Sequence, residues 1–254
     1  MSSESSGRGG VPVTEIDNAH VLLSMGAEDT WGWTAPSGPM RAEARVQWMI
    51  HSAGLKEGMR VLECGCGTGV ITQKLIKSGA QIDAVDVAEP MLQEARKNCQ
   101  VSNVRFLNVN LEDPKELEDN VYDAICGVSV LHHLNLNKAL VGLRAKLKPG
   151  GRFCFSEPNL LNPINKYLVF VPDQEKRKKM GVSPHEMAFV PQELRLAFEE
   201  CGFHVEKLAH KDFMAPFFPS WILPFIQAVQ FVAEKTPLIQ RISGSLWIEG
   251  THPR

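Results

Sequence analysis

The sequence predicts an α/β protein built on a doubly wound, seven-stranded and mostly parallel sheet, and three observations lead to this fold class. The middle of the chain alternates apolar, strand-like runs with segments of helical spacing. The connections between these segments are only a few residues long, which is typical of β–α units with helices on both faces of a parallel sheet. The first strand-like run ends in a glycine-rich turn that opens a helix.

Each strand is predicted from a short apolar or alternating run. The run at 104–110 alternates apolar and polar residues, whereas the run at 121–130 is almost continuously apolar, as in a buried strand. The expected strands are 59–65, 81–87, 104–110, 121–130, 152–158, 203–211 and 244–252.

Helices are predicted where apolar residues recur at helical spacing between start and stop signals. Pro90 stands in the first turn of one helix, Gly79 ends another, and Pro149-Gly150-Gly151 closes a third. The expected helices are 40–54, 70–79, 89–100, 137–151 and 191–202.

Two long segments, 159–190 and 212–243, interrupt this alternation and are rich in large apolar side chains. We expect them to be helical cap insertions within a domain of residues 56–254, and to converge over the ligand site. Residues 13–55 are expected to form an N-terminal helical cap. The polar, Gly- and Ser-rich residues 1–12 are expected to be a disordered tail.

Composition excludes several classes of protein. The formal net charge of −2 argues against a surface that reads nucleic-acid phosphates. The six cysteines are scattered and form no C-x-x-C pair, which predicts reduced thiols in a cytoplasmic protein and no metal site. We find no signal-peptide pattern and no clean run of about 20 apolar residues. The oligomeric state is not predicted.

Gly65, Gly67 and Gly69 form the turn after the first predicted strand. A dinucleotide fingerprint would place the third glycine one residue later, where Val70 stands. Glu63 precedes the loop, and its carboxylate would repel a diphosphate. It suits the cationic ammonium and sulfonium of S-adenosylmethionine (SAM), which carries no phosphate.

Asp86 ends the second predicted strand. A carboxylate at this position can accept hydrogen bonds from both hydroxyls of a ribose. Asp83 lies on the same strand face and is the rival candidate. We favour Asp86 because it lies nearer to the carboxyl end of the strand, where ligands bind in such sheets.

Five motifs, taken together, resemble those of the class I SAM-dependent methyltransferases. They are Glu63-Cys-Gly-Cys-Gly-Thr-Gly69, Asp86-Val-Ala-Glu-Pro-Met91-Leu92, Asn108-Val-Asn-Leu-Glu-Asp113, the run from Tyr122 to Leu134, and Leu147-Lys-Pro-Gly-Gly151. The resemblance covers 56–158 and, more loosely, 186–211. It implies a Rossmann-like fold whose last strands pair in antiparallel fashion, and it implies SAM as the cofactor. It does not specify the substrate.

Carried over position by position, the resemblance also implies which residues hold SAM. Glu63, Gly65 and Gly67 would line the methionine end, and Asp86 would hold the ribose. The remaining implied contacts are Val87 and Met91 near the adenine, Asn110 and Leu111 at its edge, and Val128 under the methionine. Asn110 departs from the family pattern, in which many relatives carry Asp.

An oxygen acceptor would also need a general base. His132, Glu157 and His185 are the candidates, with His20 as a further one, and the sequence does not rank them. Trp31 and Trp33 are candidates for stacking on the cofactor or the acceptor.

The sequence therefore predicts a SAM-dependent methyltransferase that acts on the oxygen or carbon of a small, lipophilic acceptor. Its apolar insertions would also allow the protein to bind peripherally to a membrane surface. The alternatives are an NAD(P)-linked oxidoreductase and a non-catalytic SAM-binding protein, which titrations with SAM and NADH and an assay for turnover would separate.

Overall fold

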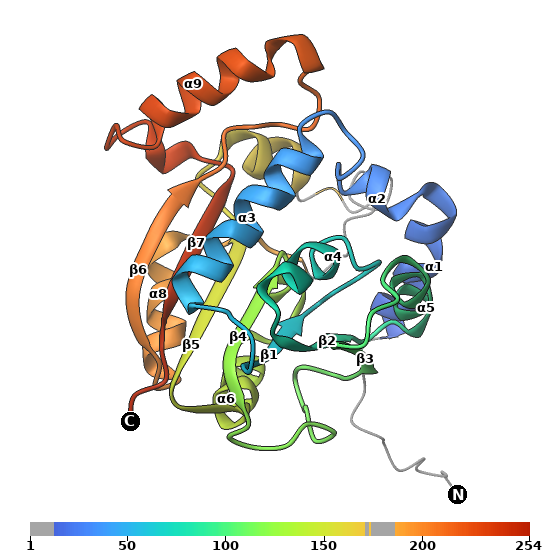
Figure 1. Cartoon of the computed structure of the whole chain (residues 1–254). Coiled ribbons are helices and arrows are strands. Elements are labelled where there is room, and N and C mark those ends of the chain that lie inside the picture. Colours follow the sequence, from blue (N-terminus) through green and yellow to red (C-terminus); the bar gives the residue numbers. More distant parts are fainter. Residues whose placement is uncertain (1–12, 171–172, 174–185) are drawn as a thin grey trace, which may run out of the picture.

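The computed structural model describes residues 13–170, 173 and 186–254 (Figure 1). The strands are β1 (Arg60–Cys64), β2 (Gln81–Asp86), β3 (Val104–Asn108), β4 (Tyr122–Val128), β5 (Leu147–Pro158), β6 (His204–Lys211) and β7 (Ser245–Thr251). The α-helices are α1 (Val13–Met25), α2 (Ala27–Thr30), α3 (Gly38–Ala53), α4 (Thr72–Leu75), α5 (Glu89–Asn98), α6 (Leu136–Lys146), α8 (Pro191–Glu200) and α9 (Leu223–Ala233). The predicted tail, His185 and much of the first insertion lie outside the described residues.

All seven strands form one sheet with the order β3-β2-β1-β4-β5-β7-β6. The first five strands pair in parallel, and β7 pairs in antiparallel fashion with β5 on one side and β6 on the other. This arrangement confirms the predicted doubly wound fold class. The chain reverses its direction of winding between β1 and β4, which is where such sheets bind their ligands.

Side chains alternate across the sheet and fill two separate cores. Leu62 and Phe153 point to the face covered by α6 and α8, where Phe198 stacks on Phe153 with ring centroids 4.7 Å apart. Val61 points to the opposite face, where Met49 of α3 packs with residues of α4 and α5. Figure 1 shows α3 and α4 on the near side of the sheet. A sheet covered on both faces explains why its central strands are so apolar.

Two predicted helices have different bounds in the structure. The segment 70–79 contains only one α-helical turn, α4, followed by a 3₁₀ turn, η1 (Ile76–Ser78). The helix expected at 137–151 ends at Lys146, because Leu147 already pairs with Tyr122 of β4. The Pro-Gly-Gly sequence therefore lies within the β5 segment and not at the helix end.

The second insertion, 212–243, begins at a buried ion-pair cluster. Asp212 accepts from Arg45 Nη2 at 2.6 Å and from Arg41 Nε at 3.3 Å, and both arginines belong to α3. This contact directs the insertion over α3, and α9 projects from that end of the molecule (Figure 1). Among the described residues, no helix combines the length and apolar character needed to cross a membrane.

Candidate active site

A cavity of about 500 Å³ opens at the carboxyl ends of β1, β2 and β4. Its walls come from the glycine loop, from the residues that follow β2, β3 and β4, from α1, and from the start of the first insertion. This volume lies in the range of small-molecule sites, and its position at the reversal of strand order is the one predicted from the sequence.

The glycine loop follows β1 with a backbone that a side chain would disturb. Gly65 has φ 66°, and a Cβ built on it would lie 2.5 Å from Cγ2 of Val130. Gly67 has φ 52°, and its Cβ would lie 3.3 Å from the Trp31 ring. Because both positions require the left-handed region and close packing, glycine keeps the loop backbone against the cavity.

Asp86 and Asp83, the rival candidates on β2, have different environments. Asp86 lines the cavity and accepts hydrogen bonds from the backbone N–H groups of Gly67 and Ala88, each at 2.9 Å. Desolvation in the cavity wall raises the pKa of Asp86. Asp83 accepts from Arg105, Arg60 and Tyr122 outside the cavity lining, which makes it part of a structural ion-pair cluster.

Glu63 lies beneath the glycine loop and does not line the cavity. Its side chain belongs to a residue that is only 2% exposed, and its Oε2 has no hydrogen-bond partner within the described part of the chain. Burial, with a smaller contribution from the nearby Asp86 carboxylate, raises the pKa of Glu63 to about 7. A buried oxygen without a partner is costly, so this position favours a cation or a proton nearby.

The other residues implied to hold the cofactor lie together. Five of them line the same cavity: Val87, Met91, Asn110, Leu111 and Val128. Asn110 accepts a hydrogen bond from the backbone N–H of Glu112 at 3.0 Å, which fixes the orientation of its amide at the cavity wall.

His132 and Glu157 form a buried pair at the cavity. Glu157 is fully buried, and its Oε1 accepts from the backbone N–H groups of Val130 at 3.1 Å and Leu131 at 3.0 Å. Its Oε2 lies 2.9 Å from Nδ1 of His132. Only His132 lines the cavity, so Glu157 orients the imidazole rather than facing a ligand. The third candidate base, His185, lies outside the described residues.

The rest of the cavity wall combines aromatic, apolar and basic side chains. Trp31 packs beside Gly67, and Arg41 and Arg45 line the cavity next to Trp33. Val169 and Phe170 also line it, and Phe170 contacts His132 edge-on with ring centroids 6.0 Å apart. No described residue of 212–243 lines the cavity itself, but Asp212 at the start of that insertion binds Arg41 and Arg45, which do line it. The convergence of both insertions over the site stays a prediction.

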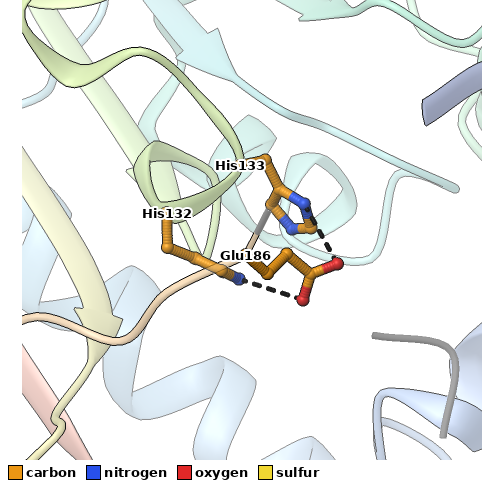
Figure 2. A group of neighbouring side chains, drawn as sticks. All are labelled: His132, His133 and Glu186. Atoms are coloured by element: carbon orange, nitrogen blue, oxygen red, sulfur yellow. Dashed lines mark ion pairs between the residues drawn. The ribbon is translucent and has the colours of Figure 1, made fainter. Parts of the chain in front are cut away.

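Two residues near the site were not selected from the sequence. His133 also lines the cavity, and Glu186 faces both histidines, with Oε2 3.9 Å from His132 Nε2 and Oε1 3.3 Å from His133 Nδ1 (Figure 2). Nothing in the sequence spacing joins Glu186 to this pair. It is brought there by the hydrogen bond from the Met187 N–H to the His132 carbonyl oxygen at 3.4 Å.

Comparison with known proteins gives consistent matches. Residues 61–151 match the family described as "Methyltransferase domain". The ubiquinone biosynthesis O-methyltransferase of Bordetella avium is 28% identical over 199 residues, which cover 75% of this chain and 82% of that protein. The protein of the same name from Acinetobacter baylyi is 26% identical over 187 residues, which cover 68% and 78%.

Solved structures support the fold. A putative methyltransferase in complex with the Haloferax volcanii activator Trm112 superimposes with a TM-score of 0.67 at 20% identity, covering 96% of this chain and all of that one. A possible histamine N-methyltransferase from Thermotoga maritima gives a TM-score of 0.64 at 17% identity, covering 94% and 99%.

Proposed function

Because this chain belongs to the class I SAM-dependent methyltransferases, we propose that it transfers the methyl group of SAM to a hydroxyl oxygen of a small, lipophilic acceptor. The family membership favours methyl transfer over the NAD(P)-linked alternative. The choice of oxygen is supported by the names of the relatives in Bordetella and Acinetobacter, which are O-methyltransferases. The preference for a lipophilic acceptor comes from the cavity itself.

The observation that carries the proposal is that one cavity joins a donor half to an aromatic half. Gly65, Gly67 and Asp86 stand on the donor side, where Trp31 packs beside Gly67, and Phe170 stands beside His132 on the acceptor side. Apolar and aromatic walls with a few placed polar groups favour an apolar ligand that is oriented by one reactive group.

The residues on the donor side fit SAM. Asp86 can accept from the ribose hydroxyls, and the loop backbone leaves room for close approach. The Glu63 carboxyl beneath the loop has an oxygen without a hydrogen-bond partner in the described chain, which suits a positively charged ligand above it. Bound SAM supplies an activated methyl group, whose bond to sulfur breaks with its electron pair staying on sulfur as the bond to the acceptor oxygen forms.

The residues on the acceptor side provide a base for the proton that the acceptor hydroxyl loses. We place the acceptor hydroxyl beside Nε2 of His132, so that the imidazole takes the hydroxyl proton as the new bond forms. The Glu157 carboxylate at Nδ1 keeps the ring in the tautomer that leaves Nε2 free to accept, and it stabilises the imidazolium. Glu157 is thus a positioning residue in this proposal.

The experiment is product identification with isotope-labelled SAM. Purified enzyme is incubated with lipid and aqueous fractions of a cell extract, and the products are examined by mass spectrometry. We expect a labelled methyl ether in the lipid fraction, and the surface variant Glu206→Gln should give the same product. A label found on nitrogen or carbon, or only in the aqueous fraction, would refute the proposed acceptor.

We extend the proposal to where the enzyme meets its acceptor. Large apolar side chains lie exposed on η4 (Ser220–Ile222) and α9, among them Trp221, Phe225 and Phe231. Lys235 lies 3.6 Å from the centroid of the Phe231 ring, so a cation flanks this surface. Aromatic side chains beside a lysine suit the boundary between lipid headgroups and acyl chains. The six free cysteines support the cytoplasmic side of such a membrane.

A further inference from the structure

We propose that His132, His133 and Glu186 bind a divalent first-row transition-metal ion on the acceptor side of the cavity. The metal-binding part of this inference stands on the geometry of the three side chains. The role of the ion in activating a hydroxyl rests on the proposed function.

The three side chains offer ligand atoms at suitable separations. One nitrogen from each histidine and one oxygen of Glu186 all lie within 4.8 Å of one another. Figure 2 shows the Glu186 carboxylate facing both imidazoles. Its Oε2 lies 3.9 Å from His132 Nε2, and its Oε1 lies 3.3 Å from His133 Nδ1. Ligands about 2.0–2.2 Å from a tetrahedral ion are roughly 3.3–3.6 Å apart, so small side-chain rotations close the site.

The surroundings of His132 match those of a metal-binding histidine. Such a histidine usually donates its second ring N–H to a carboxylate, which fixes the tautomer and strengthens the ligating nitrogen. Glu157 lies 2.9 Å from Nδ1 of His132 and also accepts from the backbone of Val130 and Leu131. His132 therefore directs Nε2 toward Glu186 from a fixed turn.

The charges of the cluster also favour a divalent ion. The carboxylates of Glu157 and Glu186 flank His132, and both are buried. A divalent ion held by the imidazoles and by Glu186 would add positive charge beside both carboxylates. Burying charges is favourable only when they are compensated at close range.

The ligand set indicates the kind of ion. Two imidazoles with one carboxylate are typical of zinc and of non-haem iron, whereas magnesium and calcium prefer oxygen ligands. Three protein ligands leave a position open toward the cavity. The sequence predicts no metal, because its cysteines form no C-x-x-C pair or zinc-thiolate pattern. Nothing in the sequence spacing joins Glu186 to the two adjacent histidines.

The ion would change how the acceptor loses its proton. With His132 Nε2 engaged as a ligand, the ion lowers the pKa of the acceptor hydroxyl and its proton passes to water. The oxygen then forms its bond to the methyl carbon as the carbon–sulfur bond breaks, and sulfur keeps the electron pair.

The test of binding uses the full chain, freed of any histidine tag and of metal, and titrated with Zn²⁺ by calorimetry and with Co²⁺ by visible absorption. We expect one ion per chain and about a 10- to 100-fold weaker affinity in Glu186→Gln and in His133→Gln. The exposed controls Glu206→Gln and His51→Gln should bind as the wild type does. SAM affinity and thermal stability of all four variants show that they are folded. No ion bound by the wild type, or equal affinity in all variants, overturns the site.

The test of its role compares methyl transfer by the metal-free and the Zn²⁺-, Fe²⁺- or Mn²⁺-loaded enzyme. At least a ten-fold gain on loading supports the inference. Equal activity without metal refutes the role of the ion while leaving the methyl-transfer proposal intact, with His132 as the proton acceptor. Absence of any labelled methyl ether in either state refutes the proposed function, and the Co²⁺ spectrum still decides whether the site exists.

Discussion

The replacement Glu63→Gln gives the sharpest test of how the donor side is built. Burial raises the pKa of Glu63 to about 7 from a usual value of 4.5. The carboxyl is therefore neutral in both folded and unfolded chains at low pH. As the pH rises through 4.5, the unfolded chain ionises first, and the folded protein progressively loses stability up to about pH 7.

The size of this effect follows from the two pKa values. The raised pKa of Glu63 lowers the free energy of unfolding by about 1 kcal/mol at pH 5 and by about 3 kcal/mol at pH 8, on the scale of about 1.4 kcal/mol per pKa unit. Glutamine has nearly the same shape and does not titrate. We therefore expect the stability of Glu63→Gln relative to wild type to rise by about 2 kcal/mol between pH 5 and pH 8, or roughly 4–8 °C in Tm.

The assay is thermal unfolding of both proteins without ligand at several pH values, with the exposed Glu57→Gln as a control that should show no such trend. The same two proteins are then titrated with SAM. A cation above the loop favours the ionised carboxyl. The ratio of the SAM affinity of the wild type to that of the variant should therefore increase as the pH rises. A stability difference that does not change with pH, or that favours wild type at pH 8, would refute the reasoning.

Three further outcomes follow from the site and the surface. Asp86→Asn removes a charged acceptor of the ribose hydroxyls and should weaken SAM binding about 10- to 100-fold in calorimetry, since hydrogen bonds to charged groups contribute about 1.5–3 kcal/mol; unchanged affinity would argue against the ribose role. Glu157→Gln keeps an acceptor for the backbone but not the charge beside His132, so kcat should fall at least about ten-fold and its pH profile should shift while SAM affinity stays constant. A parallel loss of SAM affinity would mean that Glu157 only supports the fold. Trp221→Ser should lower the fraction of protein that sediments with anionic lipid vesicles several-fold, because Trp221 is 79% exposed. The control Val141→Ser, at an exposed position on α6, should bind the vesicles as the wild type does. Equal binding by all three proteins would exclude the α9 surface as the membrane contact.

The sheet could be predicted because its information is local. The apolar runs, the glycine loop and the order of the motifs mark six of the seven described strands within a residue or two, and β5 is the exception because it begins five residues before the predicted 152. Boundaries were less certain where pairing with another strand decides them. Leu147 extends β5 because it meets Tyr122 across the sheet, and no pattern within residues 137–151 reveals that partner.

The site was predictable only where it follows the strand ends. Gly65, Gly67 and Asp86 come directly from the strand–loop pattern, Val128 comes from the family resemblance, and all four line one cavity. Glu186 could not be found, because only tertiary folding places it against residues that follow β4. The path of the second insertion was also hidden, since it depends on the contact of Asp212 with α3.

The position of β7 determines when the sheet can be completed during synthesis of the chain. This strand lies between β5 and β6 although it follows both along the chain. While the chain is still growing, β5 has an open edge and β6 has no neighbour in the sheet. Such edges can pair wrongly with other chains. Loss of only the few residues of β7 would therefore expose two hydrogen-bonding edges at once, and we would expect a shortened chain to aggregate.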